Sequence, residues 1–340
     1  MSNVTEFPQP QYFGNKEKLL DWIVSFLPRE AESCFDGFSG SSIVGYTLKR
    51  KGFRVISNDI LSSCYQTAKA LVENNDTALS AKDIEDLVKE NKHRDDFIER
   101  QFSDLFFTPQ ECRFLDNLAA NIQNLDHEYK RALAYTAICR TLTRKVPFGN
   151  FCHTRTMEYR LSPARVSRNP KLNEPIEPNF VEYIKQYNGA VFNNSKDNKA
   201  FNEDVLDLVP TVDVDLAYFD PPYFVVASNY HGFYHFLQTY VGYLRDVPLA
   251  HKTKMSPKKH SGFEKKSEIK SSFQELLEKS LHIPFWLISY NDRSILTLDE
   301  MAGLISPHRD VSIERYKHQH NNGGIGARKG SNEFLFVCKP

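Results

Sequence analysis

The chain is organised around residues 216–223, which read Leu-Ala-Tyr-Phe-Asp-Pro-Pro-Tyr. The first four residues are apolar or strand-forming, as is typical of a strand that is covered on both faces. The two prolines then end the strand, because neither has an N–H group to donate to a neighbouring strand. The strand therefore delivers a carboxylate, from Asp220, and an aromatic ring, from Tyr223, to one edge of a sheet.

These residues offer the partners that a planar amino group needs. The Asp220 carboxylate and the carbonyls of Asp220 and Pro221 accept hydrogen bonds, and Tyr223 supplies a flat face for stacking. A ring with an exocyclic NH₂, such as adenine, can donate both hydrogens to these acceptors while it stacks on the tyrosine. The alternative is an ordinary Asp-Pro-Pro turn after a strand, so the rest of the chain has to decide.

Composition limits the class of protein. The chain has 340 residues, no net formal charge at pH 7 and 41% hydrophobic residues, which predicts a folded protein of one large domain or two smaller ones. A nucleic-acid contact therefore requires a local basic patch. The six cysteines form no CxxC pair, so we expect no metal site, no disulfide framework and a cytoplasmic location. We also expect no membrane span and no signal peptide.

The N-terminal part of the chain contains two turns that are suited to ligand binding. Residues 12–16, Tyr-Phe-Gly-Asn-Lys, precede a helical pattern, and a glycine turn with a lysine at a helix start can bind a carboxylate or phosphate. An ordinary helix entry is the alternative. Residues 34–59 read as a strand, a glycine-rich turn, a helix and a second strand that ends at Asp59.

The spacing within residues 34–59 indicates a nucleoside site. Asp59 follows the glycine-rich turn by about twenty residues, the usual distance for an acid that holds a ribose. The turn does not match GxGxxG, which argues against a nicotinamide cofactor and suits S-adenosylmethionine, which has no pyrophosphate. A generic α/β turn with a capping aspartate remains the alternative.

Further strands are predicted on the C-terminal side. A short strand precedes Asn202 and Asp204, so both should lie at the sheet edge that carries Asp220. Residues 285–292 form another strand, and residues 312–316 pair with residues 332–337 in a long hairpin. Residues 224–235 are predicted to form a loop over the site. The predicted hairpin tip carries the basic residues Lys317, His318, His320, Arg328 and Lys329.

The middle of the chain is predicted to be helical and locally basic. A helix should begin at Thr108, because Pro109 and Glu111 complete a capping box. Residues 140–171 then carry many basic residues and a single acid, interleaved with aromatic and amide side chains, which favours contact with DNA or RNA over a solvated face. The lysine-rich residues 252–270 are either a solvated loop or a second phosphate contact.

Taken together, these motifs resemble those of the DNA N6-adenine methyltransferases of the alpha-ordered, Dam-like group, the D12 class. Residues 12–16 resemble the N-terminal cofactor motif of that family and residues 36–40, Asp-Gly-Phe-Ser-Gly, its methionine-side loop. Residues 220–223 match its catalytic tetrapeptide in full, and the long insert before them gives the alpha order. One departure is Ser42, where many relatives have glycine.

The resemblance implies a set of site residues. The catalytic residues it implies are Asp220, Pro221, Pro222 and Tyr223. The residues that it implies for S-adenosylmethionine are Tyr12, Gly14, Asn15, Lys16, Asp36, Phe38, Ser39, Gly40, Asp59, Ile60, Asn202, Asp204 and Asp220. The residues expected to contact DNA are Arg140, Arg144, Lys145, Asn150, Arg155, Arg160, Arg165 and Tyr230.

The resemblance also implies the architecture and the partners. We expect an α/β, Rossmann-like methyltransferase fold with a mostly parallel seven-stranded sheet and a C-terminal antiparallel hairpin. Residues 1–104 and 191–340 should form the catalytic domain, and residues 105–190 an inserted, mainly helical DNA-recognition domain. The expected partner is double-stranded DNA, which a monomer would methylate at a specific sequence, alone or beside a cognate restriction endonuclease. Methylation of RNA or of a protein glutamine, and a catalytically silent DNA-binding module, are the alternatives; a row of acids at one sheet edge argues against the silent module.

Overall fold

The computed structural model describes residues 6–10, 12–222, 230–259, 261–316 and 332–340, and its centre is a seven-stranded sheet. The strand order is β3-β2-β1-β4-β5-β7-β6. The first five strands in this order are parallel, and β7 runs antiparallel to both β5 and β6. The strands are β1 Ser33–Asp36, β2 Arg54–Asn58, β3 Lys199–Phe201, β4 Leu216–Phe219, β5 Phe285–Asn291, β6 Asp310–Tyr316 and β7 Glu333–Lys339. The predicted fold class is therefore confirmed.

Strand β4 is covered on both faces, as its apolar sequence predicts. Leu216 and Tyr218 point into one hydrophobic cluster, and Ala217 and Phe219 point into another. The second cluster packs beneath α11 Val205–Leu208, α13 Ile269–Lys279 and α14 Leu298–Ile305. The first is covered by α1 Leu20–Val24, α2 Ile43–Arg50, α3 Ser62–Ala68 and α12 Tyr230–Gly242.

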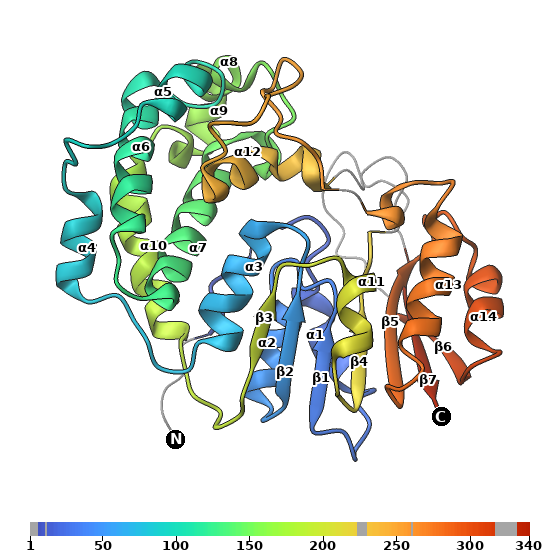
Figure 1. Cartoon of the computed structure of the whole chain (residues 1–340). Coiled ribbons are helices and arrows are strands. Elements are labelled where there is room, and N and C mark those ends of the chain that lie inside the picture. Colours follow the sequence, from blue (N-terminus) through green and yellow to red (C-terminus); the bar gives the residue numbers. More distant parts are fainter. Residues whose placement is uncertain (1–5, 11, 223–229, 260, 317–331) are drawn as a thin grey trace.

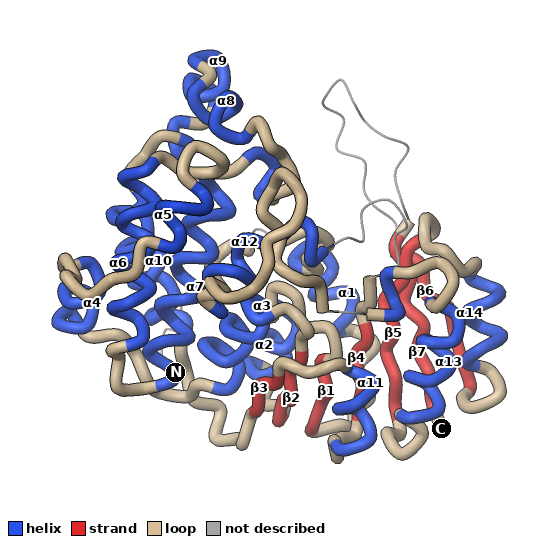
Figure 2. The backbone as a smooth tube through the Cα atoms, turned by 45° about the horizontal axis from the view of Figure 1, so that its top comes forward, coloured by secondary structure: helices blue, strands red, loops and turns tan. Residues whose placement is uncertain are grey.

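A group of helices lies beside the β3 edge of the sheet (Figure 1). Its members are α4 Ala81–Val88, α5 Phe97–Phe102, α6 Pro109–Gln123, α7 Glu128–Lys145, α8 Thr156–Leu161, α9 Pro163–Arg168 and α10 Ile176–Ala190. Figure 2 shows α8 and α9 at the end of this group that lies away from the sheet. Shorter helical turns are η1 Glu17–Leu19, η2 Lys69–Glu73, η3 Pro147–Gly149, η4 Pro170–Leu172, η5 Val209–Thr211 and η6 Gly262–Glu264.

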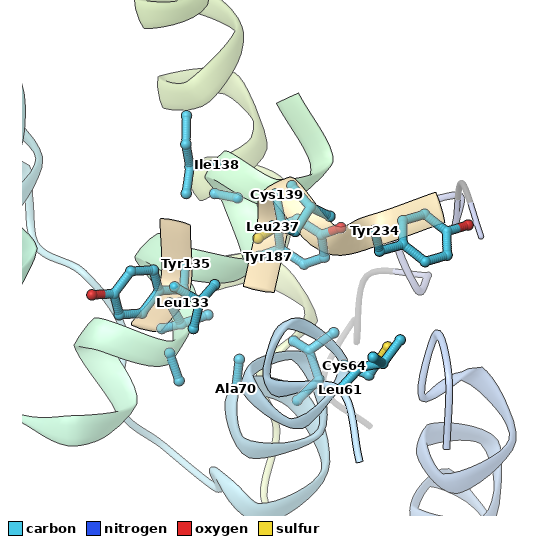
Figure 3. Close-up of a cluster of buried hydrophobic side chains, with 14 of the residues drawn as sticks. Leu61, Cys64, Ala70, Leu133, Tyr135, Ile138, Cys139, Tyr187, Tyr234 and Leu237 are labelled. Carbon is cyan, nitrogen blue, oxygen red and sulfur yellow. The ribbon is translucent and has the colours of Figure 1, made fainter. Parts of the chain in front are cut away.

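The helical group and the sheet share one hydrophobic core. Side chains from α3, η2, α7, α10 and α12 meet in the cluster of Figure 3, where Cys139 lies beside Tyr187 and Cys64 lies beside Leu61. Helices α4 and α5, which precede residue 105, pack against α6. The domain boundary at residue 105 stays a prediction, but the helical packing begins earlier along the chain.

Local sequence signals placed several elements correctly. Helix α6 begins after Thr108, whose side chain accepts from the Glu111 N–H, while the Glu111 carboxylate accepts from the Thr108 N–H. The hairpin also pairs as predicted, with Ser312 opposite Val337 and Tyr316 opposite Glu333. The predicted hairpin tip lies outside the described residues.

Two predicted loops need correction. Helix α12 begins at Tyr230, so the second half of the predicted loop at 224–235 is helical, and its first half lies outside the described residues. The lysine-rich stretch is not a bare solvated loop, because the fully buried Phe263 packs edge-on against Phe38 and Phe273. Among the described residues, no helix is both long and apolar enough to cross a membrane.

Candidate active site

A cavity of about 990 Å³, counted with its open mouth, lies at the carboxyl ends of β1, β2 and β4. The chain runs from β1 outward to β2 and β3 and then returns to β4 on the other side of β1, so the strand order reverses there. Open α/β sheets bind ligands at such a switch point. The described residues that line the cavity fall in seven segments: 12–16, 36–41 with 43–44, 58–61, 203–205, 218 with 220–222, 230–231, and 259 with 261 and 264.

The loop after β1 is shaped for close approach. Gly40 has a φ of +49°, and a Cβ atom there would lie 2.9 Å from the ring of Tyr12. The Gly40 N–H donates to Oδ2 of Asp59 at 2.8 Å, so the glycine loop is fixed to the end of β2. Only a residue without a side chain satisfies both the backbone conformation and the contact.

Asp36, at the end of β1, carries a buried oxygen without a hydrogen-bond partner. The residue is 1% exposed, and its Oδ2 accepts from the Gly45 N–H at 3.1 Å while Oδ1 has no such partner. The pKa of this carboxyl is raised to about 8, mainly by burial and also by the charges of Asp220 and Asp59, although the Gly45 hydrogen bond lowers it. A cationic ligand group beside Oδ1 would favour the ionised form of this carboxyl and lower its pKa.

Asp59, at the end of β2, is a second buried acid. Its oxygens accept from the N–H groups of Gly40 and Leu61, both at 2.8 Å. Burial raises the pKa of Asp59 to about 6, although these two hydrogen bonds lower it. Each oxygen keeps a lone pair for a ligand hydroxyl, which suits a ribose.

Asp220, which follows β4, is held by Lys16. The two side chains form an ion pair of 2.9 Å, and the Lys16 ammonium also donates to the Gly14 carbonyl at 3.3 Å. The ammonium that was predicted to bind a ligand carboxylate thus contacts the predicted catalytic acid. Pairing with a buried cation keeps a carboxylate ionised and fixes its orientation.

The structure brings most of the predicted cofactor residues together. The described residues of this set that line the cavity are Tyr12, Gly14, Asn15, Lys16, Asp36, Phe38, Ser39, Gly40, Asp59, Ile60, Asp204 and Asp220, with Pro221 and Pro222 beside them. Asn202 does not line it; its amide donates to the Asp59 carbonyl and accepts from Lys259. Tyr223 lies outside the described residues. Tyr230, assigned to DNA contact, instead lines the cavity and stacks on Tyr12, with ring centroids 5.7 Å apart.

Among the described residues beyond β4, four line the cavity that were not assigned to the site from the sequence: His231, Lys259, Ser261 and Glu264. Three of them lie in the lysine-rich stretch, whose role was left open. The sequence feature that could have revealed these residues is Phe263, an aromatic residue in a polar run. Its burial against Phe38 holds this stretch against the cavity.

Comparison with known proteins gives matches along nearly the whole chain. Residues 12–284 match the family described as D12 class N6 adenine-specific DNA methyltransferase. The type II methyltransferase M2.HphI of Haemophilus parahaemolyticus is 35% identical to this chain. The match covers 99% of this chain and 99% of the length of M2.HphI. The chain belongs to this family. M.CviAII of Paramecium bursaria Chlorella virus 1 is 23% identical, and the match covers 96% of this chain and 97% of that protein. M.FokI of Planomicrobium okeanokoites is 27% identical, and the match covers 91% of this chain and 50% of that protein.

Membership of the D12 class makes this chain an adenine-specific DNA methyltransferase. It decides against the RNA, protein-glutamine and silent-module alternatives. In the glycine loop of this methyltransferase, Ser42 has a φ of 64°, in the left-handed region. Glycine enters that region without strain, so this position would also accommodate glycine.

The structure of the insert corrects the predicted DNA contacts. Arg160 is 2% exposed, and its guanidinium forms two hydrogen bonds with the Glu111 carboxylate, at 2.8 and 2.9 Å. Lys145 is 1% exposed and lies 3.0 Å from the same carboxylate. Burial raises the pKa of Glu111, but these two cations lower it more, so its net pKa lies below the ordinary value. Arg160 and Lys145 therefore bind within the insert, and both side chains are buried rather than exposed for DNA contact.

Two more of the predicted DNA contacts are buried. The Arg140 guanidinium packs over the ring of Tyr183, and Asn150 accepts from the Cys152 N–H within its own turn. Of the remaining insert residues, Arg155 and Arg165 are exposed and Arg144 is partly exposed. These three stay candidates for DNA contact.

Proposed function

We propose that this methyltransferase binds S-adenosylmethionine in the cavity at the carboxyl ends of β1, β2 and β4. We further propose that it transfers the methyl group to N6 of an adenine that has left the DNA duplex. The observation that carries this proposal is the Lys16–Asp220 ion pair at the wall of an acidic cavity. An oriented carboxylate is the acceptor that an adenine amino group needs.

The charges of the cavity suit this cofactor. Its described walls carry six acids and two lysines: Asp36, Asp59, Glu203, Asp204, Asp220, Glu264, Lys16 and Lys259. S-adenosylmethionine has two positive groups, a sulfonium and an ammonium, and only one carboxylate, so a surplus of acids favours it electrostatically. A dinucleotide, with two phosphates, would be repelled. When bound, the sulfonium supplies an electrophilic methyl group.

Individual residues fit the parts of the cofactor. Asp59 keeps lone pairs for the ribose hydroxyls, and the unpartnered Oδ1 of Asp36 offers an acceptor for a cationic group. Gly40 leaves room for close approach of a ligand to the backbone. Phe38 and Ile60 provide apolar surface for a planar base.

The residues around Asp220 act on the target base. The Asp220 carboxylate accepts one hydrogen of the adenine amino group, and the Pro221 carbonyl accepts the other. These hydrogen bonds pull electron density toward N6 and orient its lone pair for attack. The proton that N6 loses on methylation can pass to the Asp220 carboxylate. Stacking of the adenine on Tyr223 remains part of this proposal, although Tyr223 lies outside the described residues.

Reaching N6 in this way requires the adenine to leave the duplex. Extrusion costs a few kcal/mol, which contacts in the pocket offset. The relatives M2.HphI and M.FokI are named as type II methyltransferases. We therefore propose that this enzyme methylates a specific sequence as a monomer and protects it from a cognate restriction endonuclease.

Calorimetry and sequencing test the proposal together. Wild-type protein should bind S-adenosylmethionine and S-adenosylhomocysteine with micromolar affinity. Asp59→Asn should weaken both, and Asp207→Asn, an exposed acid on α11 outside the cavity, should not. Genomic DNA incubated with the protein and cofactor should gain N6-methyladenine at one sequence. Lack of cofactor binding by folded protein, or methylation of RNA alone, would refute the proposal.

A further inference from the structure

The turn between α7 and α8 presents one aromatic side chain to solvent. Phe148 is 69% exposed, the most exposed of the large hydrophobic side chains among the described residues. The residues on both sides of Phe148 are all buried: Val146, Pro147, Gly149, Asn150 and Phe151. The turn is thus firmly anchored, and Phe148 is the part of it that projects outward.

The backbone holds Phe148 in an unusual conformation. Its φ of 57° and ψ of 12° lie in the left-handed region, which a bulky residue rarely adopts. The turn is closed by hydrogen bonds from the Gly149 N–H to the Val146 carbonyl and from the Asn150 N–H to the Pro147 carbonyl. Strain of this kind persists where the surrounding structure imposes it, and it clusters at functional sites.

The surface around Phe148 is aromatic and basic. Its ring centroid lies 5.9 Å from that of His153 and 6.1 Å from that of Tyr159. The guanidinium of Arg165 stacks over Tyr159 at 4.1 Å. Exposed arginines beside exposed aromatic rings suit a ligand that has both phosphates and flat apolar faces.

The same turn is bonded to the helix that forms part of the active-site wall. The Phe151 N–H donates to the Phe233 carbonyl at 2.8 Å, and the Phe151 carbonyl lies 3.0 Å from Nε2 of His235. Both partners lie in the first turns of α12, whose first residues, Tyr230 and His231, line the cavity. The position of Phe148 is thereby fixed relative to the cavity.

We propose that Phe148 is a wedge that enters the base stack of duplex DNA beside the target adenine and holds the duplex open while the adenine is extruded. Apolar side chains inserted between base steps unstack them. The exposed ring supplies the stacking surface, its anchored turn resists displacement, and the arginines beside it hold the phosphates. This inference rests on the proposed function, because it requires an extruded base.

The test compares paired and unpaired targets in a synthetic duplex that contains the sequence found to be methylated. One duplex has the target adenine opposite thymine and the other has it opposite an abasic site, where extrusion costs less. Phe148→Ala should slow single-turnover methylation of the paired target about 10- to 100-fold and that of the unpaired target less than about threefold. Phe148→Tyr should retain the wild-type rate. Leu161→Ala, which removes another exposed hydrophobic side chain from the insert, is the matched control and should change neither rate.

Two further measurements separate the wedge from other roles. The fluorescence of a 2-aminopurine at the target position increases when the base leaves the stack. Phe148→Ala should reduce that fluorescence increase and leave the affinity for S-adenosylhomocysteine unchanged. Should the alanine variant lose stability, Phe148→Gly removes the ring and tolerates the left-handed backbone, with the same expected rates. Equal losses on both duplexes, or no loss, would overturn the inference. A wild-type protein that modifies no adenine would overturn the proposed function as well.

Discussion

The Nζ atom of Lys16 lies 2.9 Å from Oδ2 of Asp220, and the two side chains are 6% and 16% exposed. Lys16 precedes η1 and Asp220 follows β4, so the ion pair joins the N-terminal turn to the catalytic strand. The sequence suggested separate roles for the two residues. Their contact makes Lys16 a positioning residue for the acid that the target amino group is proposed to meet.

Asp220→Asn should abolish methyl transfer while leaving cofactor affinity within about tenfold of wild type. The amide has nearly the shape of the carboxylate but carries an N–H₂ donor, and it cannot take up the proton that N6 loses. Single-turnover methylation and calorimetry measure the two effects. Asp220→Ala is a poorer choice, because it removes the partner of a buried ammonium and should also cost about 1.5–3 kcal/mol of stability. Near-normal turnover by Asp220→Asn would assign the chemistry to another group.

Cofactor affinity should fall as the pH drops through about 6. Burial raises the pKa of Asp59 to about 6, and only the ionised form has its full set of acceptors for ribose hydroxyls. Calorimetry between pH 5 and 8 measures the change, which should reach about tenfold per pH unit below the pKa. Asp59→Asn should bind weakly throughout and flatten the profile. An Asp59→Asn profile as steep as that of wild type would place the titrating group elsewhere.

Asp36→Asn should stabilise the ligand-free protein increasingly as the pH rises from 5 to 9. The pKa of Asp36 is about 8 in the folded state, above the ordinary value of 3.8, so its proton favours the folded state at low pH. That contribution is lost as the pH rises through about 8. The asparagine keeps an acceptor for the Gly45 N–H without a buried charge. Thermal melting gives the slope, and Asp207→Asn, an exposed change, should show none.

Arg160→Ala and Arg165→Ala should separate folding from DNA binding. Arg160 is buried against Glu111, so its loss leaves a buried carboxylate with one cation fewer and should cost about 3–5 kcal/mol of stability. Arg165 is exposed, so its loss should leave the melting temperature unchanged and weaken DNA binding. Chemical denaturation and a DNA titration measure both variants. The reverse pattern would restore Arg160 as a DNA contact.

The contacts of Glu111 explain why the sequence predicted the helices of the insert better than it predicted which side chains lie on the surface of the insert. The capping box of Thr108 and Glu111 is a local signal, because the two residues are three positions apart, and it predicted the start of α6. The same carboxylate binds Arg160, 49 positions away, and no local pattern records that contact. Charge counting therefore placed Arg160 and Lys145 on the surface. The cavity was predicted better, because Asp36, Asp59 and Asp220 each lie at the end of a strand or directly after one, and local apolar runs reveal those strands.

The exposed arginines of the insert should divide into base-reading and phosphate-binding residues. Arg155 and Arg165 lie on the surface near α8 and α9, and Arg144 is partly exposed at the end of α7. Loss of an arginine that reads a guanine edge should cost about 1–3 kcal/mol at the cognate site and relax the methylated sequence at one position.

Loss of a phosphate-binding arginine should instead weaken binding to all sequences alike and reduce the salt dependence. Sequencing N6-methyladenine in genomic DNA treated with each alanine variant distinguishes the two outcomes, and Arg160→Ala, whose side chain is buried, serves as the control for loss of folding. If all three exposed variants methylate the wild-type sequence with unchanged preference at every position, these arginines bind only phosphates. Sequence choice would then belong to another part of the chain, because phosphate contacts are the same at every base pair and cannot select among sequences.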